Sequence, residues 1–142
     1  MKEKYMLEAI KQAKKAYKID EVPIGAVIVK NNKIISKGYN KKEKTKIVTK
    51  HAEIIAIEKA CRKLKTWHLD ECELYTTLEP CLMCSGAIIH SRIKKIYCSI
   101  KNDNNDLKKL VKEKNYKANI EYGLYEKESI SLIQNFFNKK RK

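Results

Sequence analysis

The sequence predicts an α/β fold, a three-layer α-β-α sandwich built around a five-stranded mixed sheet. Strand-like and helix-like segments alternate along the chain, and a short turn joins the first two strand-like segments. The 142 residues are enough for one hydrophobic core. Because no internal repeat or linker divides them, we expect a single domain over residues 1–142, with a frayed basic tail from near residue 138.

The first part of the chain is expected to form a helix and a β-hairpin. Residues 2–17 carry apolar side chains at helical spacing, with lysines between them. Ile24–Val29 is β-branched and nearly continuous, which is typical of a buried strand. Asn31 and Asn32 indicate a turn, and Ile34–Asn40 then forms the second strand of the hairpin.

The rest of the chain alternates between helices and strands. After a polar, lysine-rich loop over residues 41–50, His51–Leu64 presents a broad apolar stripe that indicates a helix. Pro80 suits the first turn of a later helix. We expect further strands over residues 73–77, 95–100 and 118–122, and further helices over residues 80–90, after residue 106 and over residues 126–137.

The net charge of +15 favours a polyanionic partner, with nucleic acid first and an anionic membrane surface second. Almost all of this charge is lysine, and lysine, asparagine and isoleucine are all abundant, so a compositional bias would give the same excess. No apolar run is long enough to span a membrane, and the N-terminus lacks the apolar core of a signal peptide. We therefore expect a cytoplasmic protein without a membrane partner.

The five cysteines are odd in number, which argues against a disulfide framework. Cys61, Cys72 and Cys98 lie in apolar or strand contexts, where buried free thiols are expected. Cys81 and Cys84 differ, because they form a Pro-Cys-x-x-Cys at the start of an expected helix. Taken alone, this motif also fits a redox pair or half of a structural zinc site.

A second segment, His51-Ala52-Glu53, also stands at the start of an expected helix. The positive end of a helix lowers thiol pKa values, which favours metal binding by Cys81 and Cys84 as thiolates. With His51 they make three protein ligands, and a catalytic zinc keeps its fourth position for a water that it acidifies. Glu53 is a carboxylate suited to moving protons beside that water. We therefore predict one catalytic Zn²⁺ per chain.

The pattern H-x-E…P-C-x-x-C is the signature of zinc-dependent nucleobase deaminases. At these residues the chain resembles the bacterial tRNA-specific adenosine deaminases of the cytidine-deaminase-like superfamily. The resemblance runs from the first helix to about Ile100 and is strongest in four stretches: Glu21–Val27, Gly38–Asn40, His51–Ile54 and Thr77–Ile93.

The resemblance implies hydrolytic conversion of adenosine to inosine at the wobble position of a tRNA anticodon. It also implies a homodimer that binds the anticodon stem-loop near the dimer interface. The roles that it implies are zinc ligation by His51, Cys81 and Cys84, proton transfer by Glu53, binding of the target base by Asn40, and a pocket lined by the backbone around Ala52.

The chain departs from the family pattern in two places. Ile47–Lys50 stands where the family usually has Asp-Pro-Thr-Ala before the His-Ala-Glu. Lys101–Asp106 is shorter than the corresponding family loop and has no glycine. Because that loop lies on the RNA side in the family, both changes bear on RNA binding and leave the zinc chemistry untouched.

Two other functions stay open at this point. One is a deaminase of free guanine, cytosine or a nucleoside, against which the high charge and the stretch Ala87–Arg92 count. The other is a catalytically inactive, zinc-bearing RNA-binding subunit, which would have no need of Glu53.

Overall fold

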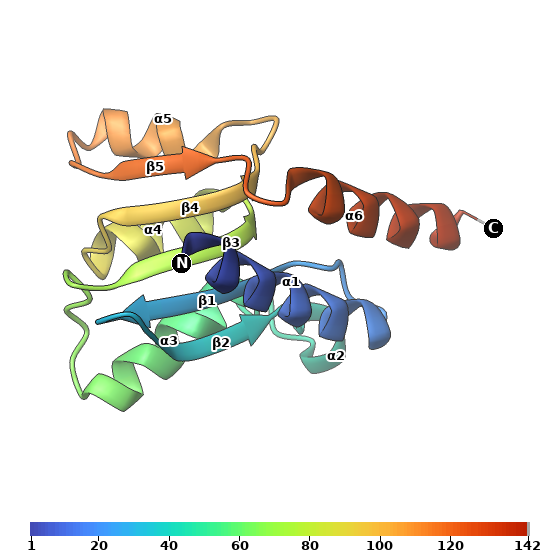
Figure 1. The fold of residues 1–142 in the computed structure, drawn as a ribbon, viewed down its shortest axis with the longest axis horizontal. Helices are drawn as coiled ribbons and strands as arrows, with labels where there is room; N and C mark the ends of the chain where they lie inside the picture. The colour runs from blue at the N-terminus through green and yellow to red at the C-terminus, as the bar shows by residue number, and fades with distance from the viewer. Residues whose placement is uncertain (142) are drawn as a thin grey trace.

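The computed structural model describes residues 1–141 and contains a five-stranded sheet in the order β2-β1-β3-β4-β5 (Figure 1). Strand β1 pairs antiparallel with β2 and β3, whereas β3, β4 and β5 are parallel. The predicted mixed sheet is therefore confirmed. The strands are β1 (Gly25–Lys30), β2 (Lys33–Tyr39), β3 (Glu73–Leu78), β4 (Lys95–Ile100) and β5 (Asn119–Tyr122).

Helices cover both faces of this sheet, which confirms the three-layer arrangement. Helix α1 packs on one face, and α6 lies beside it and reaches past the edge of the sheet (Figure 1). Helices α3, α4 and α5 cover the opposite face. The helices are α1 (Lys2–Lys18), α2 (Lys42–Thr45), α3 (Ala52–Leu64), α4 (Leu82–His90), α5 (Asp106–Glu113) and α6 (Glu126–Lys140).

Strand β1 is buried on both sides, which explains its continuous apolar sequence. Val27 and Val29 face α1 and join a core that includes the stacked rings of Tyr75 and Tyr97, whose centroids lie 4.5 Å apart. Ala26 and Ile28 face the other core, beneath α3, α4 and α5. Each helical layer is thus held by its own hydrophobic cluster.

Two glycines bring helices unusually close to the hairpin. A Cβ on Gly25 would lie 2.1 Å from the carbonyl oxygen of Ala9 in α1. A Cβ on Gly38 would lie 2.4 Å from the carbonyl oxygen of Ala52, the first residue of α3. Neither position has room for a side chain, so the end of β2 rests directly on the start of α3.

Three local expectations were wrong. The loop over residues 41–50 contains the short helix α2, and the basic tail is helical as far as Lys140. Pro80 precedes the N-cap Cys81 and is not in the first turn of α4. Lys142 lies outside the described residues.

Helix α2 is stabilised by a residue that lies outside its own segment of the sequence. The buried carboxylate of Glu21, from the segment between α1 and β1, accepts hydrogen bonds from the backbone N–H groups of Glu43 (3.1 Å) and Lys44 (2.6 Å). These contacts satisfy unpaired N–H groups in the first turn of α2. Within the described part of the chain, no helix is long and apolar enough to cross a membrane.

Candidate metal centre

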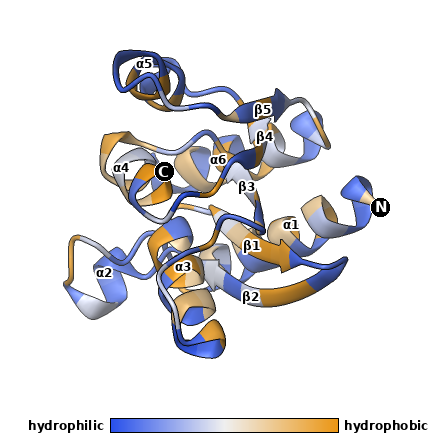
Figure 2. Ribbon diagram, turned by 90° about the vertical axis from the view of Figure 1, so that its left-hand side faces the viewer, coloured by the Kyte–Doolittle hydropathy of each residue, from blue (hydrophilic) through white to orange (hydrophobic). Residues whose placement is uncertain are grey.

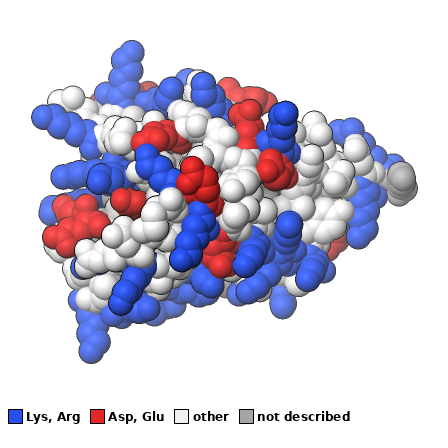
Figure 3. All heavy atoms as spheres, in the orientation of Figure 1, with Lys and Arg blue, Asp and Glu red and all other residues white. Residues whose placement is uncertain are grey.

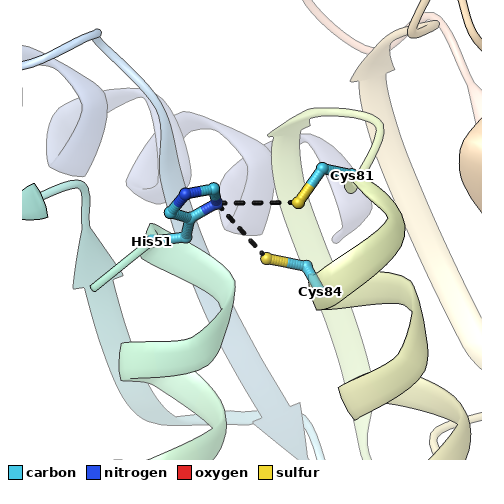
Figure 4. A group of neighbouring side chains, drawn as sticks. All are labelled: His51, Cys81 and Cys84. Carbon is cyan, nitrogen blue, oxygen red and sulfur yellow. Dashed lines mark hydrogen bonds between the residues drawn. The ribbon is translucent and has the colours of Figure 1, made fainter. Parts of the chain in front are cut away.

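His51, Cys81 and Cys84 converge between the N-termini of α3 and α4 (Figure 4). His51 is the N-cap of α3, Cys81 is the N-cap of α4, and Cys84 lies one turn further along α4. The atom Nδ1 of His51 lies 3.7 Å from Sγ of Cys81 and 3.6 Å from Sγ of Cys84. The sequence prediction that both segments begin helices and meet at one point is confirmed.

These distances fit one tetrahedral zinc ion. Zinc–sulfur and zinc–nitrogen bonds of about 2.3 and 2.0–2.1 Å at a tetrahedral angle separate the two ligand atoms by about 3.6 Å. Among the described residues, no further His, Cys, Asp or Glu joins this group. A set of two thiolates and one imidazole, with no fourth protein ligand, is typical of a catalytic zinc site.

The three ligands are electrostatically coupled. The pKa of Cys81 is lowered to about 3, first because its sulfur accepts a hydrogen bond from the Cys84 thiol and also because it interacts with His51. The pKa of Cys84 is raised, because its thiol donates that bond and is buried. The thiolate of Cys81 in turn raises the pKa of His51. The centre therefore attracts positive charge, which suits a divalent cation.

Glu53 lies within the first turn of α3, next to this centre, and is only 4% exposed. Burial raises the pKa of its carboxyl group to about 7. None of the ion pairs in the described part of the chain involves it. A carboxyl group with a pKa near neutrality both accepts and releases a proton readily.

Asn40 and Ala52, the two residues implied to bind substrate, contact each other. Oδ1 of Asn40 accepts a hydrogen bond of 2.9 Å from the backbone N–H of Ala52. Its Nδ2 has no hydrogen-bond partner among the described residues, and no fully buried side-chain nitrogen or oxygen is left unpaired there. Nδ2 is therefore open to solvent as a hydrogen-bond donor.

Comparison with known proteins identifies the family. Residues 1–100 match the cytidine and deoxycytidylate deaminase zinc-binding region. A tRNA-specific adenosine deaminase of Bacillus subtilis (strain 168) is 41% identical over 146 residues, which cover 99% of this chain and 91% of that protein. The chain belongs to the tRNA-specific adenosine deaminases of the cytidine and deoxycytidylate deaminase family.

Solved structures agree with this assignment. One, from work on A-to-I editing by tRNA:A34 deaminases at the wobble position of transfer RNA, has a TM-score of 0.84 and 34% identity. That match covers 90% of this deaminase and 97% of the other chain. A guanine deaminase from Bacillus subtilis is 37% identical with a TM-score of 0.67, over 76% of this chain and 68% of that one.

The metal centre of this deaminase is a zinc-binding site formed by His51, Cys81 and Cys84. The three other cysteines lie outside the site. Cys72 and Cys98 are buried free thiols, as expected, whereas Cys61 is a free thiol that is only half-buried, which differs from the expectation. The alternative of a redox pair does not explain why an imidazole completes the site at the spacing of a metal ligand.

Sequence reasoning gave no role to two buried carboxylates of this deaminase, those of Glu21 and Glu79. Glu21 holds α2, in the segment that leads from Asn40 to His51. Glu79 lies two residues before Cys81, is 1% exposed, and accepts hydrogen bonds from the backbone N–H of Asn102 (3.0 Å) and the hydroxyl of Tyr122 (2.9 Å). For Glu79, the only local feature that could have indicated a role was its position between a buried strand and the metal ligand Cys81.

Proposed function

We propose that this chain deaminates adenosine to inosine at the wobble position of tRNA anticodons and releases ammonia. The observation that carries the proposal is the zinc centre with only three protein ligands, beside the buried carboxyl group of Glu53. The similarity to tRNA-specific adenosine deaminases over 99% of the chain supports the RNA substrate. Such a substrate implies an enzyme that works in the cytoplasm.

The reaction forms a carbon–oxygen bond at C6 of the adenine and breaks the bond from C6 to the amino nitrogen. Bound zinc supplies Lewis-acid activation of the attacking water at neutral pH. Glu53 takes a proton from that water, passes it to N1 of the ring, and then delivers a proton to the departing amino group. Its pKa of about 7 suits this exchange in both directions.

Asn40 and Ala52 orient the base in this proposal. The bond from the Ala52 N–H fixes Oδ1 of Asn40, so that Nδ2 of Asn40 remains free to donate to an acceptor on the base. The adjacent backbone at Ala52 lines the same pocket. Because Ala52 directly follows His51, the contact also ties the orienting amide to a zinc ligand.

Positive charge around the site supports an RNA substrate. The segment that connects Asn40 to His51 carries five lysines, and Lys101 lies in the loop after β4: Lys41, Lys42, Lys44, Lys46, Lys50 and Lys101. On the face that carries α1, Figure 3 shows lysine and arginine side chains around much of the rim, with acidic side chains between them toward the middle. Such a surface attracts phosphates without selecting a sequence, so the binding pocket must supply specificity.

The outer face of α4 supports a homodimer. This helix is apolar over most of its length (Figure 2), and Leu82 is 62% exposed. Apart from the neighbouring residues and backbone of α4 itself, nothing in the described part of the chain lies within 4 Å of a Cβ placed on Gly86, although a glycine inside a helix costs about 1 kcal/mol relative to alanine. A second copy of the chain packed against α4 would account for both the apolar surface and the glycine.

The decisive experiment incubates the purified, zinc-loaded protein with bacterial total tRNA and maps inosine by sequencing. The proposal expects inosine at the wobble position of specific tRNAs, together with one equivalent of ammonia. The free-base alternative, favoured by the partial similarity to a guanine deaminase, expects ammonia from guanine, cytosine or a nucleoside and none from RNA. Bound zinc without turnover on any substrate would indicate an inactive RNA-binding subunit.

A further inference from the structure

We propose that Glu79 is a positioning residue of this deaminase, which holds the loop of residues 101–105 beside the zinc centre in the shape that binds RNA. The inference rests on the proposed function. Glu79 acts through the loop and makes no contact with the reacting atoms. Removing it is therefore expected to weaken RNA binding and to leave the chemistry largely intact.

Glu79 joins the zinc centre to this loop through both its main chain and its side chain. Its backbone N–H donates to the carbonyl oxygen of Ile100, the last residue of β4, at 2.8 Å. Its Oε1 accepts the backbone N–H of Asn102 at 3.0 Å. Because Cys81 follows two residues later, one short segment fixes both a zinc ligand and the start of the loop.

The loop depends on Asn102 for its shape. The carbonyl oxygen of Asn102 accepts the N–H of Asn105 at 2.9 Å, and its Oδ1 accepts the N–H of Asn104 at the same distance. The third contact, from its own N–H, goes to Glu79. A loop without glycine is thus held by hydrogen bonds around one asparagine, and Glu79 anchors that asparagine to the zinc-bearing segment.

The second oxygen of Glu79 extends the network to β5. Oε2 accepts the hydroxyl of Tyr122 at 2.9 Å. The Nζ atoms of Lys101 and Lys108 lie 5.2 and 4.9 Å from the centre of the Tyr122 ring. Two cations are therefore placed beside the loop, where they are available to the phosphates of an RNA strand.

Stability of the fold alone is a weak explanation for this arrangement. Glu79 is 1% exposed, and no ion pair within residues 1–141 includes it. A buried carboxylate is costly even when it is hydrogen-bonded, and replacing buried charged groups by apolar ones is often neutral or stabilising. What the carboxylate adds here is a fixed position for Asn102.

That position shapes a cavity of about 290 Å³ between the loop and α6. Leu78, next to Glu79, and Asn102 both line it, and Ile130 and Ile133 of α6 form the opposite side. In Figure 1 the loop between β4 and α5 lies beside the start of α6. A displaced Asn102 would change this surface, which includes the residue three positions before Cys81, without moving the three zinc ligands.

The test compares four variants: Glu79→Ala, Glu79→Gln, Tyr122→Phe and Tyr116→Phe. Glutamine is the rescue, because its amide oxygen accepts from the Asn102 N–H and its amide nitrogen donates to the Tyr122 hydroxyl oxygen. Tyr116→Phe is the matched control, since that hydroxyl donates to the carbonyl oxygen of Ile93 at 2.6 Å and does not touch Glu79. Hydrogen exchange over residues 101–105, zinc content, and KM and kcat on an anticodon stem-loop RNA are measured.

Glu79→Ala is expected to lose exchange protection at Asn102 and to raise KM about tenfold, because the hydrogen bonds from Asn102 and Tyr122 to the carboxylate are both lost. Its kcat should change less than about threefold, and it should keep one zinc per chain. Tyr122→Phe should raise KM by a smaller factor. Glu79→Gln and Tyr116→Phe should retain the KM of the original protein.

Several results would overturn the inference. A fall in kcat at unchanged KM, or loss of zinc with unchanged exchange in the loop, would mean that Glu79 acts on the chemistry or on Cys81. If the alanine variant does not fold, equal KM values for Tyr122→Phe and Tyr116→Phe would equally overturn it. If the original protein does not deaminate RNA, the proposed function fails, and the exchange comparison separately decides whether Glu79 holds the loop.

Discussion

Oδ1 of Asn40 accepts a 2.9 Å hydrogen bond from the backbone N–H of Ala52 and so connects the end of β2 to the first residue of α3. The bond fixes which end of the Asn40 amide faces the protein, because only oxygen can accept from the N–H. The nitrogen end is left for a ligand. The contact therefore separates the observed role of Asn40, holding α3, from its proposed role, binding the base, and a substitution can test them independently.

Asn40→Asp keeps the oxygen that accepts from Ala52 and removes the amide donor. We expect the variant to fold, to bind zinc, and to lose about 10–100-fold in kcat/KM on RNA, as for one lost hydrogen bond to substrate. Asn31→Asp is the matched control, because Asn31 is an exposed residue of the β1–β2 turn, away from the zinc centre. Equal kcat/KM in the two variants would contradict the proposed role of Asn40.

Glu53→Gln should retain zinc and fold, because a buried amide replaces a buried carboxyl group of nearly the same shape. Turnover should fall about 10²–10⁴-fold, the usual contribution of a positioned acid–base group. Glu58→Gln, on the same helix but paired at the surface with Lys50, serves as the control and should keep near-normal turnover. The two variants are compared by their single-turnover rates with saturating RNA. Substantial activity in Glu53→Gln would refute proton transfer by this residue.

Chelation of zinc should abolish turnover and lower the melting temperature, because the metal joins the ends of α3 and α4. Added zinc should restore both. Cys84→Ser should bind less than stoichiometric zinc and melt lower, whereas Cys61→Ser should keep its zinc, since Cys61 lies outside the site. Zinc content by mass spectrometry and thermal unfolding are the measurements. A fully zinc-loaded Cys84→Ser would show that the ligands are assigned wrongly.

Gly86→Glu should convert the proposed dimer to a monomer, because it places a charge on the apolar outer face of α4, where a Cβ would meet no other element among residues 1–141. Ser131→Glu adds the same side chain to an exposed position of α6 and should leave the dimer intact. Sedimentation equilibrium of both variants distinguishes the outcomes. If the protein itself sediments as a monomer, α4 is not a dimer surface.

Stability should decline in alkaline solution as the pH rises from about 10 to 12. Burial raises the pKa of Tyr116 to about 12 and also raises the pKa values of Tyr75, Tyr97 and Tyr122. Above pH 10 the unfolded chain therefore binds fewer protons than the folded one, so the free energy of unfolding falls with pH. Urea unfolding at pH 9, 10 and 11 measures the slope, which should be shallower for Tyr116→Phe.

The sequence predicted the parts of this protein that depend on short-range patterns. Ile24–Val29 indicated a buried strand, because β1 packs against helices on both faces. The zinc site was also predictable, since His51 and Cys81 each stand at the start of a helix. Each of those signals is contained within a few neighbouring residues.

Features that depend on partners distant in the sequence were not predictable in this way. Helix α2 was missed because the carboxylate of Glu21 that holds it lies 22 residues before Glu43. Glu79 received no role because its partners, Asn102 and Tyr122, are 23 and 43 residues away and meet it only once the parallel strands are paired. Long-range hydrogen bonds to buried side chains leave no local pattern.

The close contact at Gly38 limits how this deaminase is able to evolve. Any change of that residue adds a Cβ that collides with the carbonyl oxygen of Ala52, immediately after the zinc ligand His51. Substitutions at Gly38 are therefore not tolerated, even though substitutions on the lysine-rich surface are. If the two segments 41–50 and 101–105 bind RNA as proposed, adaptation toward a different RNA would proceed through them, because their backbones are held by the side chains of Glu21 and Glu79.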